Sequence, residues 1–200
     1  GLLDPVPKEV LSRYSQLLLL GGLSHYGLGN MEKASQYLAI YLKLLPKHPG
    51  ASKILASIYI DRGDPARAIE LLEPVQSLAP NDPQLLSLLA AANMAQRRYA
   101  QAAAYLEKAV RVSGGAPDLR ADFGVSLIGS GQADIGFNQL QQAFAKDPGQ
   151  ARAGMVMTTL YLKRDQPKKA LEVIDAVVRR NPKNVDAANL QGVARVAAGD

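Results

Sequence analysis

The feature that most constrains this sequence is a period of 34 residues. Small residues recur at that spacing without insertion or deletion, at Ala34, Ala68, Ala102, Gly136 and Ala170. Four residues after each of them stands a leucine or isoleucine, at Leu38, Leu72, Leu106, Leu140 and Ile174. Twelve residues after each small residue stands a proline or glycine, at Pro46, Pro80, Gly114, Pro148 and Pro182. Each of these sets is called a column below. Because several columns share the same 34-residue period and the same register, they predict an array of one repeated supersecondary unit.

Each period predicts two helices joined by a short turn. Leu55 and Ile58 recur at helical spacing before the pattern breaks. At the break, Gly63 is expected to be left-handed, Asp64 to cap the second helix, and Pro65 to take its first position. Equivalent junctions stand at Asn30, Asp82-Pro83, Ala116-Pro117 and Gln166-Pro167. The pattern therefore predicts an all-α fold of antiparallel helix pairs.

Two further columns hold the same phase. The column of Gly63 also contains Gly29, Arg97, Gly131 and Asp165. A column of small residues in the first helix of each pair contains Gly22, Ala56, Ala90, Gly124 and Thr158. Since the distance between packed helices depends on the side chains at their contact, we expect the helices of a pair to touch at the small residues.

The period divides the chain into five repeats and two end segments. The repeats are expected at 15–48, 49–82, 83–116, 117–150 and 151–184. Residues 1–14 do not hold the phase, and we expect a leader there and the start of a long first helix from about Pro7 to Tyr26. Residues 185–200 read as the first helix of a sixth repeat that stops before its second helix. We therefore expect the chain to be a segment of a longer solenoid.

The columns resemble the tetratricopeptide repeat family over residues 15–200. The second period reads Leu55-Ala56, Tyr59, Gly63-Asp64, Ala68, Leu72, Val75 and Pro80. The fourth reads Phe123-Gly124, Leu127, Gly131, Gly136, Leu140, Ala143 and Pro148. The chain departs from the family pattern in lacking its early tryptophan, in Tyr41 at a small position, and in Gly114 at a closing proline. The resemblance implies a right-handed superhelical array of antiparallel helix pairs, an α-solenoid.

The resemblance also implies where a partner binds, because in this family the first helix of each repeat lines a concave surface. The matching positions here are Leu19, Leu23, Tyr26, Lys53, Ser57, Ile60, Ser87, Met94, Asp118, Ile128, Arg152, Met155, Thr159 and Leu162. The apolar members of this set would suit an amphipathic helix or an extended hydrophobic segment of a protein or peptide partner. The alternative is that neighbouring helices pack on each other and cover part of this strip.

The sequence contains no residue pattern typical of catalysis. It has no cysteine, which excludes thiolate chemistry and thiolate metal sites. Of the two histidines, His25 is expected to pack and hydrogen-bond between helices, and His48 to lie exposed in a turn. Asp118 and Asp122 share one helix face without an accompanying base, nucleophile or metal ligand, so we expect them on a solvated face. We predict no enzymatic activity, no cofactor and no metal.

Charge and hydropathy restrict the partner further. The net charge is +5, but the basic pairs alternate with acidic residues and form no stripe for a phosphate backbone, so nucleic-acid binding is not expected. The longest apolar run, Leu17 to Leu23, is too short to span a membrane. Some family members hold acidic chaperone tails with lysine and asparagine, whereas this chain has Asp118 and Asp122 in that part of the groove. We therefore predict no binding of such tails.

A narrower resemblance is to the bacterial tetratricopeptide-repeat lipoproteins associated with PEP-CTERM sorting, exosortase and exopolysaccharide genes. The stretches that carry it are Pro7-Lys8-Glu9-Val10, Gly29-Asn30 with Ala34, Tyr37-Leu38, and the run Arg67 to Pro74. It implies a scaffold in the periplasm or cell envelope. The alternatives are a cytoplasmic adaptor or co-chaperone, or the recognition arm of a larger enzyme. Self-association is also expected through the last helix, where Leu190, Val193 and Ala194 lack a covering helix.

Overall fold

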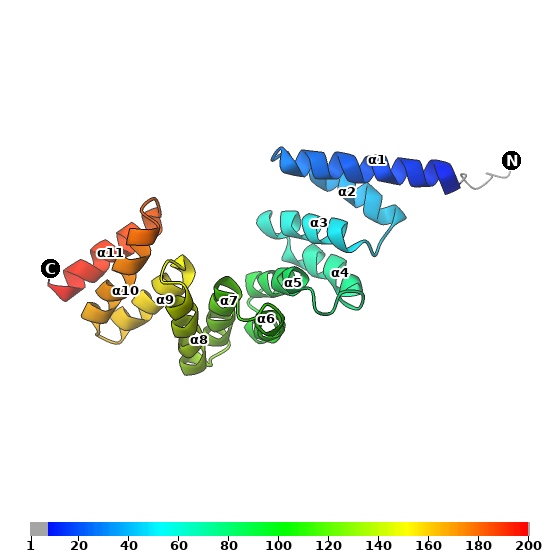
Figure 1. Cartoon of the computed structure of the whole chain (residues 1–200). Helices are drawn as coiled ribbons and strands as arrows, with labels where there is room; N and C mark the ends of the chain where they lie inside the picture. The colour runs from blue at the N-terminus through cyan, green and yellow to red at the C-terminus, as the bar shows by residue number, and fades with distance from the viewer. Residues whose placement is uncertain (1–7, 200) are drawn as a thin grey trace. The chain divides into compact units, whose positions relative to one another are not determined.

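The computed structural model describes the backbone of residues 8–199 and the side chains of residues 13–199. Every regular element in these residues is an α-helix, which confirms the predicted all-α class (Figure 1). The helices are α1 (Lys8–Gly27), α2 (Met31–Leu44), α3 (Pro49–Asp61), α4 (Pro65–Gln76), α5 (Pro83–Ala95), α6 (Tyr99–Val112), α7 (Pro117–Gly129), α8 (Ala133–Lys146), α9 (Ala151–Lys163), α10 (Pro167–Arg180) and α11 (Val185–Ala198). The long first helix is present, whereas the leader before it, Pro7 included, lies outside the described residues.

The chain forms two compact units, which are described separately below. The first comprises residues 1–80 and contains α1 to α4. The second comprises residues 81–200 and contains α5 to α11. In both units, helices that follow each other along the chain pack together in pairs joined by short turns (Figure 1).

The turn between α3 and α4 has the predicted chemistry. Gly63 is left-handed with φ of +75°, and its N–H donates to the carbonyl of Ile60 over 3.0 Å. The Asp64 carboxylate accepts a hydrogen bond from the Arg67 N–H, and Pro65 is the first residue of α4. Gly63 therefore satisfies a carbonyl at the end of α3, whereas Asp64 satisfies an N–H at the start of α4 and Pro65 removes one.

The Gly63 column is left-handed throughout, even where the residue is not glycine. Gly29 and Gly131 have φ of +75° and +90°. Arg97 and Asp165 have φ of +58° and +53°, although a side chain makes this conformation unfavourable. The repeat thus imposes one turn geometry at all five positions, and two residues adopt it at a conformational cost.

In the first unit, the small columns allow close packing of α1 on α2. Gly22 lies directly against Leu38, where a Cβ atom on the glycine would come within 2.7 Å of the leucine side chain. Ala34 and Leu38 are fully buried and join Leu18, Leu55 and other residues in one hydrophobic core. The core of this unit therefore consists of the residues that recur in phase along the sequence.

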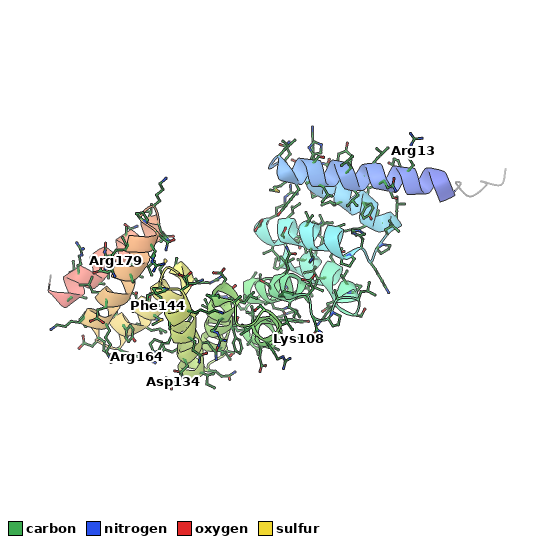
Figure 2. The ribbon with its side chains drawn as sticks, viewed as in Figure 1. Arg13, Lys108, Asp134, Phe144, Arg164 and Arg179 are labelled. Atoms are coloured by element: carbon green, nitrogen blue, oxygen red, sulfur yellow. The ribbon has the colours of Figure 1, made fainter. Side chains whose placement is uncertain are left out.

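In the second unit, glycines let α7 and α8 pack backbone against backbone. A Cβ atom on Gly124 would lie 2.8 Å from the Gly136 carbonyl oxygen, and one on Gly136 would lie 2.5 Å from the Gly124 carbonyl oxygen. Arg164, at the end of α9, lies near Asp134 of α8 (Figure 2), with its Nη2 3.3 Å from Asp134 Oδ1. Its guanidinium lies over the Phe137 ring. Glycine contacts and ion pairs thus both join neighbouring helices in this unit.

The two histidines differ from their predicted environments. His48 was expected to be exposed but is half-buried, because its Nδ1 accepts a hydrogen bond from Ala51 N–H at the start of α3. Its ring also contacts the edge of the buried Tyr41 ring, with 5.3 Å between centroids. His25 stacks on Tyr37, but its buried Nδ1 has no hydrogen-bond partner among the described residues. The expected hydrogen bond of His25 is therefore wrong at this nitrogen.

One expectation for α11 is also wrong. Ala194 is fully buried in a hydrophobic cluster with Ile174 and Val177 of α10, because it faces the preceding helix. Leu190 packs against the same cluster and is half-buried. Val193 is exposed as expected, and Val196 is 81% exposed. The open apolar surface of this helix is therefore formed by its valines.

Candidate functional site

The predicted concave residues of the first unit lie on α1 and α3. On α1, Leu19 is half-buried against the core, whereas Leu23 and Tyr26 are exposed. On α3, Lys53, Ser57 and Ile60 are all half-buried. The structure thus leaves only part of this apolar strip accessible in the first unit.

In the second unit, the predicted residues separate into packed and accessible side chains. Ile128, Met155 and Leu162 are half-buried and pack against the hydrophobic clusters. Asp118, Arg152 and Thr159 are more accessible, with the Thr159 hydroxyl donating to the Met155 carbonyl over 2.9 Å. The remaining two, Ser87 and Met94, are half-buried and line a pocket.

That pocket is the candidate site of the second unit, with a volume of about 430 Å³. It is referred to below as the α5–α7 pocket. Its lining residues come from four helices: Ser87, Ala90, Ala91, Met94 and Ala95 of α5, Tyr99 and Leu106 of α6, Asp122 and Val125 of α7, and Arg152 of α9. The structure therefore brings together three of the predicted partner-binding residues, Ser87, Met94 and Arg152.

Small side chains on α5 explain why this space is open. Ala90, Ala91 and Ala95 fill little of the volume beside α7. The floor is formed by Leu106, which is buried, and the Tyr99 ring packs on Gly129 of α7 in place of a larger side chain. The pocket therefore combines apolar side chains with a few polar and charged groups, which could fix the orientation of a bound segment.

An ion pair forms the polar side of the pocket. Arg152 Nη1 of α9 lies 2.6 Å from Asp122 Oδ1 of α7, and the two side chains are 52% and 24% exposed. Burial raises the pKa of the Asp122 carboxyl, Arg152 opposes that rise, and the neighbouring Asp118 adds to it. The expectation that Asp122 lies on a solvated face is therefore wrong, because α9 covers it and pairs with it.

A second polar contact joins α7 to the start of α9. Gln150 Nε2 donates to Asp118 Oδ1 over 3.1 Å, while Gln150 Oε1 accepts a hydrogen bond from the Ala153 N–H and caps α9. Gln150 is itself buried, so this contact fixes the start of α9 beside α7. Asp118 and Asp122 are thereby both held by residues at the start of α9, by Gln150 at its N-cap and by Arg152 in its first turn.

Sequence reasoning did not select Asp122, Ala90, Ala95 or Tyr99 for the site. The sequence contained one signal for Asp122. It stands at the sixth position of the repeat 117–150, and the oppositely charged Arg152 stands at the second position of the next repeat. These positions meet in space, as the Asp122–Arg152 pair shows. The alanines had no such signal, because small residues at these positions also fit simple helix packing.

Two general features of the described residues concern membranes and metals. Within residues 8–199, the helices are too short or too polar to cross a membrane. Histidine, aspartate and glutamate side chains described in the structure do not gather in groups of three or more suited to a metal ion.

Comparison with solved structures shows the same fold in other repeat proteins. A thermophilic TPR protein of Thermus thermophilus is 24% identical, with a TM-score of 0.71 over 91% of this chain and 99% of that one. PilF of Pseudomonas aeruginosa is 17% identical, with a TM-score of 0.76 over 95% and 86%. YrrB, described as a TPR protein with an unusual peptide-binding site, is 21% identical, with a TM-score of 0.67 over 90% of each chain.

The sequence comparison gives the family. Among curated proteins, no relative matches this chain. The family model described as tetratricopeptide repeat matches residues 25–92 and 136–193, which together make up more than half of the sequence. With its all-α architecture of packed helix pairs, the chain belongs to the tetratricopeptide repeat family.

Proposed function

We propose that this chain is a binding scaffold without catalytic activity, and that the α5–α7 pocket holds a segment of a protein partner. The observation that carries the proposal is the pocket itself, which opens among the first helices of successive repeats in the second unit. The tetratricopeptide repeat fold supports a role in protein–protein interaction, and its concave surface is the usual place of contact.

The pocket is better suited to hold a single side chain than to contact a flat protein surface. Ala90, Ala91, Met94 and Val125 provide apolar contact, and Ser87 and the Asp122–Arg152 pair provide polar groups. A volume of about 430 Å³ has room for one large side chain and its flanking backbone. The exposed Asp118, one helical turn before Asp122 on α7, would then contact the rest of the segment.

The test is a selection of displayed random peptides against the chain, followed by titration of the recovered peptides. Ala95→Trp places a large ring at an exposed position of the pocket wall, and Ala104→Trp adds the same ring at an exposed position of α6 outside it. We expect Ala95→Trp to weaken binding by at least about tenfold through steric exclusion and Ala104→Trp to leave it unchanged. Peptides that bind all three proteins equally would contradict the proposal.

We also propose that the protein acts in the cell envelope, as a scaffold in protein sorting or exopolysaccharide export. The support is the resemblance of Gly29-Asn30, Tyr37-Leu38 and the run Arg67 to Pro74 to envelope lipoproteins of that kind. Fractionation of cells that express the full-length gene tests the location. Recovery with the membrane and periplasm is expected, whereas recovery in the cytoplasm would favour an adaptor or co-chaperone instead.

A third proposal concerns self-association through α11. Val185, Val193 and Val196 are exposed on this helix, and exposed apolar surface favours association. Light scattering as a function of concentration should show a dimer or larger species that Val196→Lys converts to monomer. A wild-type chain that stays monomeric at high concentration would contradict it.

A further inference from the structure

Acidic groups outnumber basic ones at the polar side of the α5–α7 pocket when the residue next to its lining, Asp118, is counted. Asp122 and Arg152 line the pocket and pair with each other over 2.6 Å. Asp118 lies one helical turn before Asp122 on α7 and accepts its hydrogen bond from the neutral Gln150. Asp118 lies outside the lining, but with it two carboxylates stand beside one guanidinium, and this end of α7 carries excess negative charge next to the pocket.

The two partners of the ion pair are also unequal in burial. The Asp122 side chain is the more buried of the two, whereas that of Arg152 is about half exposed. Burial raises the pKa of Asp122, which means that its negative charge is poorly solvated. A second cation beside this carboxylate would therefore be favourable, and a second anion would not.

The apolar walls lead to this carboxylate. Ala90, Ala91 and Met94 of α5 and Val125 of α7 line the same space as Asp122. Lysine and arginine bury long methylene stems along apolar surface while the charged end reaches a polar group. Their shape and charge both match a pocket with apolar walls and an acidic polar side.

We propose that the α5–α7 pocket selects a partner segment by a lysine or arginine side chain, whose stem lies against Ala91 and Met94 and whose cation reaches Asp122. This selectivity rests on the proposed function of the pocket. Arg152 then competes with the incoming cation, because its guanidinium already pairs with the Asp122 carboxylate.

An acidic side chain is the less favourable occupant. A carboxylate in this pocket would approach Asp122, with Asp118 one turn away, and Arg152 is already engaged by Asp122. Like charges brought together in a partly buried site disfavour binding. The charge preference of the pocket therefore distinguishes it from a site for acidic tails.

The test uses three pools of ten-residue peptides that differ only at a central position, which is lysine, norleucine or glutamate. The flanking positions carry one random mixture of alanine, leucine, serine and valine. Norleucine has nearly the length of lysine without its charge. We expect the lysine pool to be retained about tenfold more strongly than the norleucine pool, in line with a hydrogen bond to a charged group, and the glutamate pool least.

Two variants assign the preference to the ion pair. Asp122→Asn should lower retention of the lysine pool to the level of norleucine. Arg152→Gln removes the competing cation at an exposed position, so it should raise retention of the lysine pool. If Arg152→Gln lowers it, the assignment is wrong, and this result does not depend on the folding of the Asp122 variant.

The blocking variants separate failure of this inference from failure of the proposed function. Suppose that Ala95→Trp abolishes retention, but the wild type retains the lysine and norleucine pools equally or prefers the glutamate pool. The selectivity for basic side chains would then be overturned, while the pocket would remain the binding site. Retention that Ala95→Trp leaves unchanged would overturn both. The matched Ala104→Trp variant should behave as the wild type in every pool.

Discussion

The Asp122 carboxylate of α7 and the Arg152 guanidinium of α9 form a 2.6 Å ion pair across two consecutive repeats. The pair lies on the polar side of a pocket whose other walls are small and apolar. It therefore links the packing of α7 on α9 to the chemistry that a partner segment would meet.

The raised pKa of Asp122 predicts how its contribution to stability depends on pH. Burial is the main cause, and Arg152 only partly offsets it. Because the folded chain holds this proton more tightly than the unfolded chain, the contribution is most favourable at low pH and is lost as pH rises from about 4 through the raised pKa.

Asp122→Asn lacks this titration. The free energy of unfolding of the variant minus that of the wild type should therefore increase over the same interval and then level off. Urea unfolding at pH values from about 4 to about 7 measures the difference. A difference that decreases with pH would show that the ion pair with Arg152 affects the pKa of Asp122 more strongly than burial does.

The left-handed turns predict two stabilising substitutions. Arg97 and Asp165 occupy a conformation that favours glycine, with φ of +58° and +53°. Arg97→Gly and Asp165→Gly should each raise the free energy of unfolding by about 1 kcal/mol, since the left-handed conformation costs a residue with a Cβ atom that much. Gln96→Gly, next to Arg97 and with φ of −88°, is the control and should not stabilise the chain. Chemical denaturation of the wild type and all three variants measures the free energy of unfolding. No gain at the two left-handed positions would contradict the prediction.

The small columns predict the effect of added bulk. Ala102 is fully buried between helices, whereas Ala104 on the same helix is exposed. Ala102→Leu should lower the free energy of unfolding by about 1–3 kcal/mol through overpacking, and Ala104→Leu should change it little. Thermal melting compares the pair. An unchanged melting temperature in Ala102→Leu would contradict the role assigned to this column.

The acidic side of the pocket predicts that chaperone tails do not bind. A peptide that ends in Glu-Glu-Val-Asp would bring carboxylates toward Asp118 and Asp122. Calorimetric titration of that peptide should show no binding at micromolar concentration. Micromolar affinity would contradict this prediction and mean that another, basic surface of the chain binds the tail.

Much of the fold could be predicted from local chemistry. Gly63, Asp64 and Pro65 each have one backbone role, and the structure confirms all three. Buried Ala68 and Leu72 likewise recur at positions that only a repeated helix pair explains. These features depend on residues close together in the sequence, which is why the sequence alone was sufficient.

The candidate site could be predicted only in part. Ser87, Met94 and Arg152 lie at its lining, but the pocket exists because Ala90 and Ala95 leave space beside α7. The width of that space depends on how far apart the helix backbones lie, and no single residue encodes it. Contacts between repeats, such as the Asp122–Arg152 pair, could not be predicted for the same reason. The cap that His48 makes at the start of α3 could not be predicted because histidine has several possible roles.

The four methionines offer the most direct test of the central claim. Met94 lines the pocket, Met31 is exposed on α2, Met155 is half-buried, and Met157 is buried. With ¹³C-labelled methionine methyl groups, addition of a selected lysine-containing peptide should shift the Met94 resonance and leave those of Met31 and Met157 in place. A Met94 resonance that stays unchanged at saturating peptide, while Met31 shifts, would place the binding site elsewhere and contradict the account.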